Sequence, residues 1–184
     1  MRNKNYYFML AMLIAATACS GPPEQPTNTP FAPAFSGTMI TLPFISISQG
    51  SVLGDSPEQP FYTVISNAEQ WEQARAHLPQ QVVDAGRAAM QKESARWVIV
   101  AYGGVKATSN YSITIQRIER YSDNQIAVIV EQASPTERSA GSSAKTLPYH
   151  LVVLRQVDVS DLAQQVVVFR DANSVELARL TTAP

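Results

Sequence analysis

The chain has 184 residues, a formal net charge of −1, a single cysteine and 45% hydrophobic residues. This charge balance argues against a nucleic-acid-binding protein and against a basic membrane-binding patch. The length suits one domain with a sizeable core, and a lone cysteine leaves no internal disulfide, so stability must come from burial.

The first residues have the order of a secretory signal. Arg2 and Lys4 precede an apolar run from Tyr6 to Ala16, which is shorter than the roughly 20 apolar residues of a spanning helix. Ala16-Thr17-Ala18 directly before Cys19 resembles the lipobox of bacterial lipoproteins. This resemblance implies that residues 1–18 are a signal peptide and that Cys19 is lipidated, which would anchor the protein to an extracytoplasmic membrane surface of the bacterial cell envelope. An ordinary signal peptide or anchor with a chance cysteine is the alternative.

Cleavage before Cys19 would remove Arg2 and Lys4, two positive charges, so that −1 becomes −3. Residues 21–37, GPPEQPTNTPFAPAFSG, contain five prolines among small and polar residues. Such a segment stays extended and solvated because it buries too little to offset its ordering entropy. At about 3.1 Å per residue it would span roughly 50 Å. We therefore expect residues 19–37 to be a lipidated tether and residues 38–184 to be one domain.

Two extended segments open this domain. Residues 38–50, TMITLPFISISQG, are rich in β-branched and aromatic residues and predict one or two strands interrupted at Pro43. Proline has no N–H for a sheet ladder, so this segment should lie at a sheet edge or bend there. A second strand is expected at 61–65.

Two helices should follow. Ser66 with Glu69 three residues later has the pattern of a capping box, and apolar residues at helical spacing continue until Pro79. These apolar residues are Trp71, Ala74 and Leu78. Residues 82–93 predict a second helix, which Gly86 makes less favourable.

The remaining chain is dominated by strand patterns. Residues 96–104, RWVIVAYGG, predict a central strand buried on both faces. Alternating apolar residues on either side of a turn at 122–124 predict a hairpin, and a second hairpin is expected around a turn at Ala172-Asn173. The expected class is α+β, with a mostly antiparallel sheet and one or two helices packed on it.

Several of these elements together resemble the C-terminal domain of the PrcB-like family, bacterial proteins named after a subunit of a surface protease complex. The resemblance covers about residues 61–156 and includes the segments YGGVKATSNYSITI and TLPYHLVVL. Its specific residues are Gly103 or Gly104, Thr108, Tyr111, Thr146, Pro148, Tyr149 and His150. The family commonly has glycine before the tyrosine, where this chain has Ser109-Asn110. The resemblance implies an extracytoplasmic accessory or interaction module, and it supplies no catalytic residue.

His150, one of two histidines, is the residue most like an active-site group. Strand alternation puts Tyr149, Leu151 and Val153 on one face and His150, Val152 and Leu154 on the other. Among apolar neighbours a neutral imidazole bonded to a backbone group is the usual outcome, with a ligand or base as the alternative. His77 is expected to be an exposed residue in the last turn of its helix.

Other catalytic patterns are weak. The sequence contains no G-x-S-x-G, H-E-x-x-H or glycine-rich phosphate loop. Ser142 and Lys145 match S-x-x-K in a polar loop, without the motifs that accompany it in penicillin-binding enzymes. Asp158, Asp161 and Asp171 could be paired carboxylates but are more typical of turns and caps. We expect no catalytic residue, no metal site and no cofactor.

Aromatic residues suggest a binding surface instead. Trp71 and Trp97 are expected in the core, whereas Tyr102, Tyr111 and Tyr149 adjoin glycine, loop or proline boundaries and are expected in an exposed cluster. The loop 103–111 and the segment 146–150 should form a joint surface. Its candidate residues are Tyr102, Gly103, Gly104, Thr108, Tyr111, Pro148, Tyr149 and His150.

The sequence thus predicts a lipid-anchored, non-catalytic module that binds a protein partner, such as a secreted protease. One alternative is a module that binds envelope glycan or peptide. The other is a hydrolase with an unrecognised site.

Overall fold

The structure is a computed structural model that describes residues 37–55, 57–92, 95–135, 143–155 and 164–182. The chain divides into two units, Met1–Pro30 and Phe31–Pro184, and every described residue lies in the second. The predicted signal peptide, Cys19 and residues 20–36 of the tether therefore lie outside the described residues. Within the described residues, no helix is both long and apolar enough to cross a membrane.

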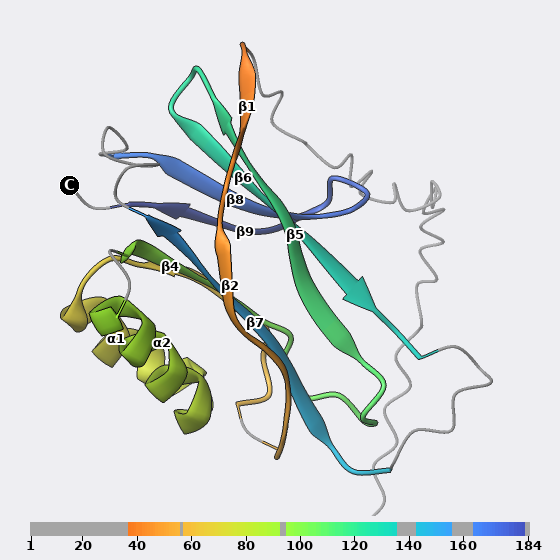
Figure 1. The fold of residues 1–184 in the computed structure, drawn as a ribbon. Coiled ribbons are helices and arrows are strands. Elements are labelled where there is room, and N and C mark those ends of the chain that lie inside the picture. Colours follow the sequence, from red (N-terminus) through yellow and green to blue (C-terminus); the bar gives the residue numbers. More distant parts are fainter. Residues whose placement is uncertain (1–36, 56, 93–94, 136–142, 156–163, 183–184) are drawn as a thin grey trace, which may run out of the picture. The chain divides into compact units, whose positions relative to one another are not determined.

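The described strands form two sheets (Figure 1). One has five strands in the order β1-β5-β6-β8-β9, and the other has four in the order β2-β7-β4-β3. The elements are β1 (Met39–Leu42), β2 (Ile45–Leu53), β3 (Phe61–Ile65), α1 (Ala68–Ala74), η1 (Arg75–His77), α2 (Gln80–Lys92), β4 (Ala95–Tyr102), β5 (Ser112–Tyr121), β6 (Gln125–Ala133), β7 (Thr146–Arg155), β8 (Val166–Asp171) and β9 (Glu176–Thr181). Every strand pair is antiparallel except β6 with β8, among the described strands. The α+β prediction with mostly antiparallel pairing is confirmed.

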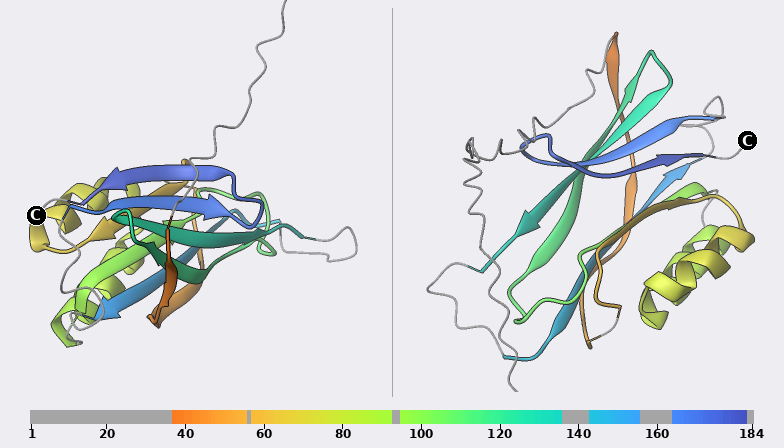
Figure 2. Two further views of the ribbon diagram at one scale, coloured as in Figure 1. Left: turned by 90° about the horizontal axis from the view of Figure 1, so that it is seen from above. Right: turned by 180° about the vertical axis from the view of Figure 1, so that it is seen from behind.

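Two hydrophobic clusters hold the layers together. One fills the space between the two sheets, and the other lies between the four-stranded sheet and the helices α1 and α2, which cover its opposite face (Figures 1 and 2). Strand β4 serves both clusters by alternation, with Trp97, Ile99 and Ala101 in the first and Val98, Val100 and Tyr102 in the second. The prediction of a central strand buried on both faces is confirmed.

Residues 39–53 run along the edges of both sheets. Strand β1 is an edge of the five-stranded sheet, and β2, which begins after the interruption at Pro43, is an edge of the four-stranded one. The predicted edge position is therefore confirmed. Among the described residues, four of the five exposed large hydrophobic side chains lie here, namely Met39, Ile40, Ile45 and Leu53.

The start of α1 differs from the prediction. Asn67, and not Ser66, is the N-cap, and its Oδ1 accepts a hydrogen bond from the Gln70 backbone N at 2.9 Å. The Gln70 Oε1 in turn accepts from the Ser66 backbone N at 2.6 Å. The helix begins one residue later than the capping-box spacing predicts, so Gln70 rather than Glu69 reaches back across the first turn, and it bonds to the residue before the cap.

Gly86 has a packing role that the sequence did not reveal. Helix α2 begins at Gln80, two residues before its predicted start, and packs against α1. A Cβ atom on Gly86 would lie 2.0 Å from Cη2 of Trp71, which is only 2% exposed. Glycine is therefore needed for the two helices to approach this closely.

Both predicted hairpins are present. Strands β5 and β6 meet at a turn in which Asn124 has φ 61°, a left-handed conformation that asparagine tolerates well. Strands β8 and β9 are joined by a turn in which Asp171 Oδ1 accepts from the backbone N of Asn173 and Val175, both at 2.8 Å. Asp171 thus has the turn role that the sequence favoured, while Asp158 and Asp161 lie outside the described residues.

Candidate partner-binding surface

The loop after β4 is hydrogen-bonded to the start of β7, so the two predicted segments lie side by side. Lys106 and Thr146 exchange two backbone hydrogen bonds, with N···O distances of 2.8 and 3.0 Å. Gly103 N donates to Pro148 O at 2.9 Å, and Thr146 Oγ1 donates to Thr108 O at 2.7 Å. These four bonds hold residues 103–108 firmly against residues 146–148.

Most of the predicted surface residues are nevertheless buried. Tyr102, Gly103, Gly104, Pro148 and His150 are buried, whereas Thr108, Tyr111 and Tyr149 are half-buried. The expectation that Tyr102 is exposed is wrong: its side chain is 0% exposed, and its hydroxyl donates to Pro57 O at 2.5 Å. Burial raises the pKa of Tyr102 to about 12. Strand alternation places Tyr102 on the same face of β4 as Val98 and Val100, beneath the helices. The side chain is therefore buried although a glycine follows it.

Gly104 allows two loops to meet. Its φ is +70°, and a Cβ atom there would lie 2.4 Å from Glu58 O. The next residue, Val105, donates its backbone N–H to that same oxygen at 3.1 Å. Gly104 therefore positions the loop, and it cannot contribute a side chain to a contact.

The side chain of His150 connects three strands. The Ile115 backbone N on β5 donates to His150 Nδ1 at 2.8 Å, and His150 Nε2 lies 2.8 Å from Ser46 Oγ on β2. Because Nδ1 accepts a hydrogen bond, the proton resides on Nε2 and is donated to Ser46. Burial lowers the pKa of His150, which favours this neutral form. The predicted hydrogen bond between this imidazole and a backbone group is confirmed.

The accessible part of this surface is smaller than predicted and includes residues that the sequence did not single out. Lys106 Nζ lies 5.8 Å from the ring centroid of Tyr111, close enough for a weak cation–π contact. Tyr149 OH lies 3.1 Å from Ser48 Oγ and the ring packs on the helix-side cluster, so Tyr102, Tyr111 and Tyr149 do not form one exposed cluster.

Leu53 is the main residue that sequence reasoning missed. Its side chain is 77% exposed, and it pairs with Thr146, the residue that also pairs with Lys106 from the other side. The sequence did contain a signal for it, because residues 38–54 have no charged side chain and Leu53 stands at the end of this segment. An apolar residue at the end of an uncharged edge strand indicates a candidate contact site. We define the loop surface as Leu53, Lys106, Thr108 and Tyr111.

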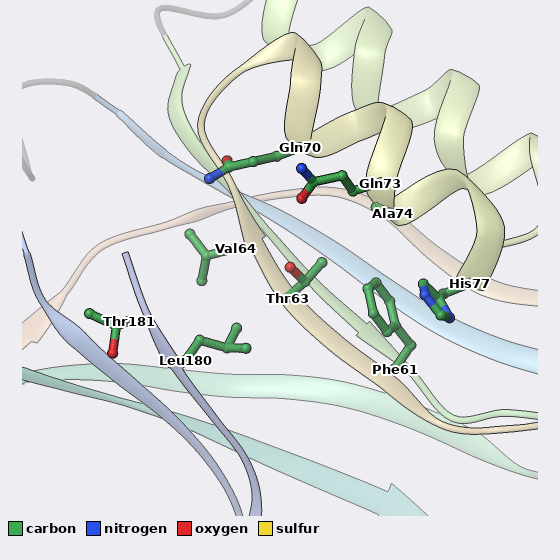
Figure 3. Close-up of a pocket in the computed structure, with 9 residues that line it drawn as sticks. All are labelled: Phe61, Thr63, Val64, Gln70, Gln73, Ala74, His77, Leu180 and Thr181. Carbon is green, nitrogen blue, oxygen red and sulfur yellow. The ribbon is translucent and has the colours of Figure 1, made fainter. Parts of the chain in front are cut away.

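A separate groove lies where β3, α1 and β9 meet (Figure 3). Its volume is about 310 Å³. At one end the Phe61 ring stacks on the exposed His77 ring, with centroids 4.7 Å apart. His77 is therefore exposed as predicted, but it is held against an aromatic ring. Among the described residues, no three His, Cys, Asp or Glu side chains gather in a way that could hold a metal ion.

The central part of the chain matches a known protein family. The family described as PrcB C-terminal matches residues 97–155, which run from β4 to the end of β7 and include most of the loop surface. The predicted resemblance to this family, expected at about residues 61–156, is confirmed for residues 97–155. No curated protein and no solved structure matches the chain.

Proposed function

We propose, from the PrcB C-terminal domain at residues 97–155, that this chain is a lipid-anchored, extracytoplasmic, non-catalytic module that serves as an accessory subunit of a protease complex. The family match by itself supports association with a protease complex and nothing finer. The lipid anchor rests on the lipobox-like Ala16-Thr17-Ala18-Cys19 sequence.

The loop surface is the observation that supports partner binding. It combines a backbone held by paired hydrogen bonds with an exposed apolar side chain, Leu53, and a half-buried aromatic ring, Tyr111. A rigid backbone loses little conformational entropy on binding, and aromatic and apolar anchors supply most of the energy of protein interfaces. The surface therefore suits a protein partner.

A non-catalytic role is supported by the way His150 is used. Both ring nitrogens are engaged, one with the backbone of β5 and the other with Ser46. A general base must have a nitrogen within reach of a substrate proton, and an imidazole occupied on both sides has none to offer.

The first experiment is crosslinking of the intact chain in its native membrane, followed by mass spectrometry of what co-purifies. We expect a secreted or surface protease, crosslinked through residues 103–111 or near Leu53. The absence of any reproducible protein partner would contradict the proposal.

Two single substitutions then locate the contact. Leu53→Ser removes an apolar side chain that is 77% exposed, so it should weaken capture of the partner without altering the fold. Val175→Ser is the matched control, because Val175 is 50% exposed but lies between β8 and β9. Equal capture by both variants would exclude Leu53 from the interface.

A further inference from the structure

We propose that the groove between β3, α1 and β9 binds a short, uncharged peptide segment in extended conformation, which adds to the free edge of β3. This site shares no residue with the loop surface and does not depend on the proposed protease partner.

The groove lies along two strand edges. Thr63 and Val64 are consecutive on β3, so their side chains point to opposite faces of the sheet, yet both line the groove. The same holds for Leu180 and Thr181 on β9. A cavity that contacts both faces of a strand must run along its edge. Among the described strands β3 pairs only with β4, and β9 only with β8, so the edges that face the groove are unpaired.

An unpaired edge presents backbone N–H and C=O groups at the spacing that an extended peptide needs. Proteins usually protect such edges with charged residues or proline. Strand β3 has the sequence FYTVI, which contains neither. The edge of β3 therefore lacks the charged residues and proline that would disfavour strand addition.

The side chains above this edge suit a peptide backbone. Gln70 and Gln73 extend their carboxamides from α1 over β3 (Figure 3). The Gln70 oxygen already accepts from Ser66 N and Ser66 Oγ, so its NH₂ group is the part left to donate to a peptide carbonyl. Thr63 and Thr181 add hydroxyl groups that can donate or accept.

The lining selects against charge. None of the nine lining residues is Asp, Glu, Lys or Arg. A charged group placed here would lose hydration and would find no Asp, Glu, Lys or Arg in the lining, where His77 is the one side chain that can ionise, so its binding is unfavourable at neutral pH. The volume of about 310 Å³ is at the lower end of the roughly 300–1,000 Å³ of ligand pockets, so a short segment fits.

The aromatic residue distinguishes a peptide from a glycan. A sugar stacks on an exposed ring face, and Phe61 offers little of one, because His77 stacks on the ring at a centroid distance of 4.7 Å and the half-buried side chain packs against the helix-side cluster. The Phe61–His77 pair is better suited to contact the apolar side chain of a peptide residue.

Peptide titrations monitored by NMR test this proposal on the intact, ¹⁵N-labelled chain in detergent micelles. The probes are a panel of end-blocked hexapeptides of uncharged residues, the same peptides with a central Lys or Glu, and a tetramer of N-acetylglucosamine. We expect at least one uncharged peptide to shift the backbone amide signals of residues 61–65 and the side-chain amide signal of Gln73. N-methylation of alternate amides of that peptide removes ladder donors and should weaken binding at least tenfold.

Substitution of the groove provides the second readout. Gln73→Glu places a charge in the groove from an exposed position and should weaken peptide binding at least tenfold with an unchanged melting temperature. Gln91→Glu, at an exposed position of α2 outside this groove, should bind like the unmodified chain. The proposal is overturned if no uncharged peptide shifts the β3 signals, if charged peptides bind equally well, if N-methylation has no effect, or if only the sugar binds.

Discussion

Replacing His150 tests whether one buried side chain ties the two sheets together. His150→Phe keeps a ring at this position but removes the acceptor of the Ile115 backbone N–H, a buried hydrogen bond of 2.8 Å. A buried donor left without a partner costs about 1–3 kcal/mol. The lost bond to Ser46 should cost less, because Ser46 is exposed and water can replace the histidine. We therefore expect the free energy of unfolding to fall by about 1–3 kcal/mol.

The effect should depend on pH. Burial holds the pKa of His150 below its ordinary value of 6.5 in the folded chain, so the unfolded chain binds the proton more readily. The contribution of the neutral His150 to the free energy of unfolding is thus complete above about pH 6.5. It decreases as the pH falls below this value, by at most about 1.4 kcal/mol per pH unit. His150→Asn offers an acceptor close to the position of Nδ1 but does not titrate, so it should lack this share of the pH dependence.

The assay is urea unfolding followed by circular dichroism, for both variants and the unmodified chain at pH 7.5, 6.5 and 5.5. The stability advantage of the unmodified chain over His150→Asn should shrink between the higher and the lower pH. Other titrating groups are common to both proteins and cancel in this difference. A constant difference across the three pH values, or a His150→Phe variant as stable as the unmodified chain, would refute the reasoning.

Three further substitutions test local packing, each by urea unfolding. Gly86→Ala should destabilise the chain by about 1–3 kcal/mol through overpacking against Trp71, despite the better helix propensity of alanine; a stabilised variant would contradict this contact. Gly104→Ala would place a Cβ atom 2.4 Å from a carbonyl oxygen at a φ of +70°, so it should lower the free energy of unfolding by at least about 1–2 kcal/mol. An unchanged urea midpoint would show that the loop relaxes freely. Asn67→Ala should lower the free energy of unfolding by about 1 kcal/mol, and Ser66→Ala should lower it less. A larger loss for Ser66→Ala would show that Ser66 is the cap.

The candidate surface was only partly predictable. The tyrosines at loop and proline boundaries led to the prediction that residues 103–111 and 146–150 form a joint surface, and residues 103–108 do lie against residues 146–148. The exposure of Tyr102 did not follow, because a boundary position says nothing about which layer covers a strand face. Leu53 became a candidate only when its ladder partner was known, since neighbours across a sheet can be far apart in sequence.

The sequence alone determined the local elements and their class. The apolar run of β4, the alternation in both hairpins and the break at Pro43 are properties of short segments, and the structure retains them. The helix predicted up to Pro79 is shorter, because α1 ends at Ala74 and Leu78 is buried in extended conformation after the 3-10 turn η1. The faces of β7, with His150 opposite Tyr149, followed from the same period of two.

Only the tertiary structure decided how these elements combine. The division into two sheets, the parallel pairing of β6 with β8, and the use of both His150 nitrogens depend on contacts between residues distant in the chain. The groove at the β3 and β9 edges arises in the same way, because neither strand's sequence indicates which other edge it will face. Periodicity specifies which side of an element is buried, whereas long-range packing specifies its neighbour.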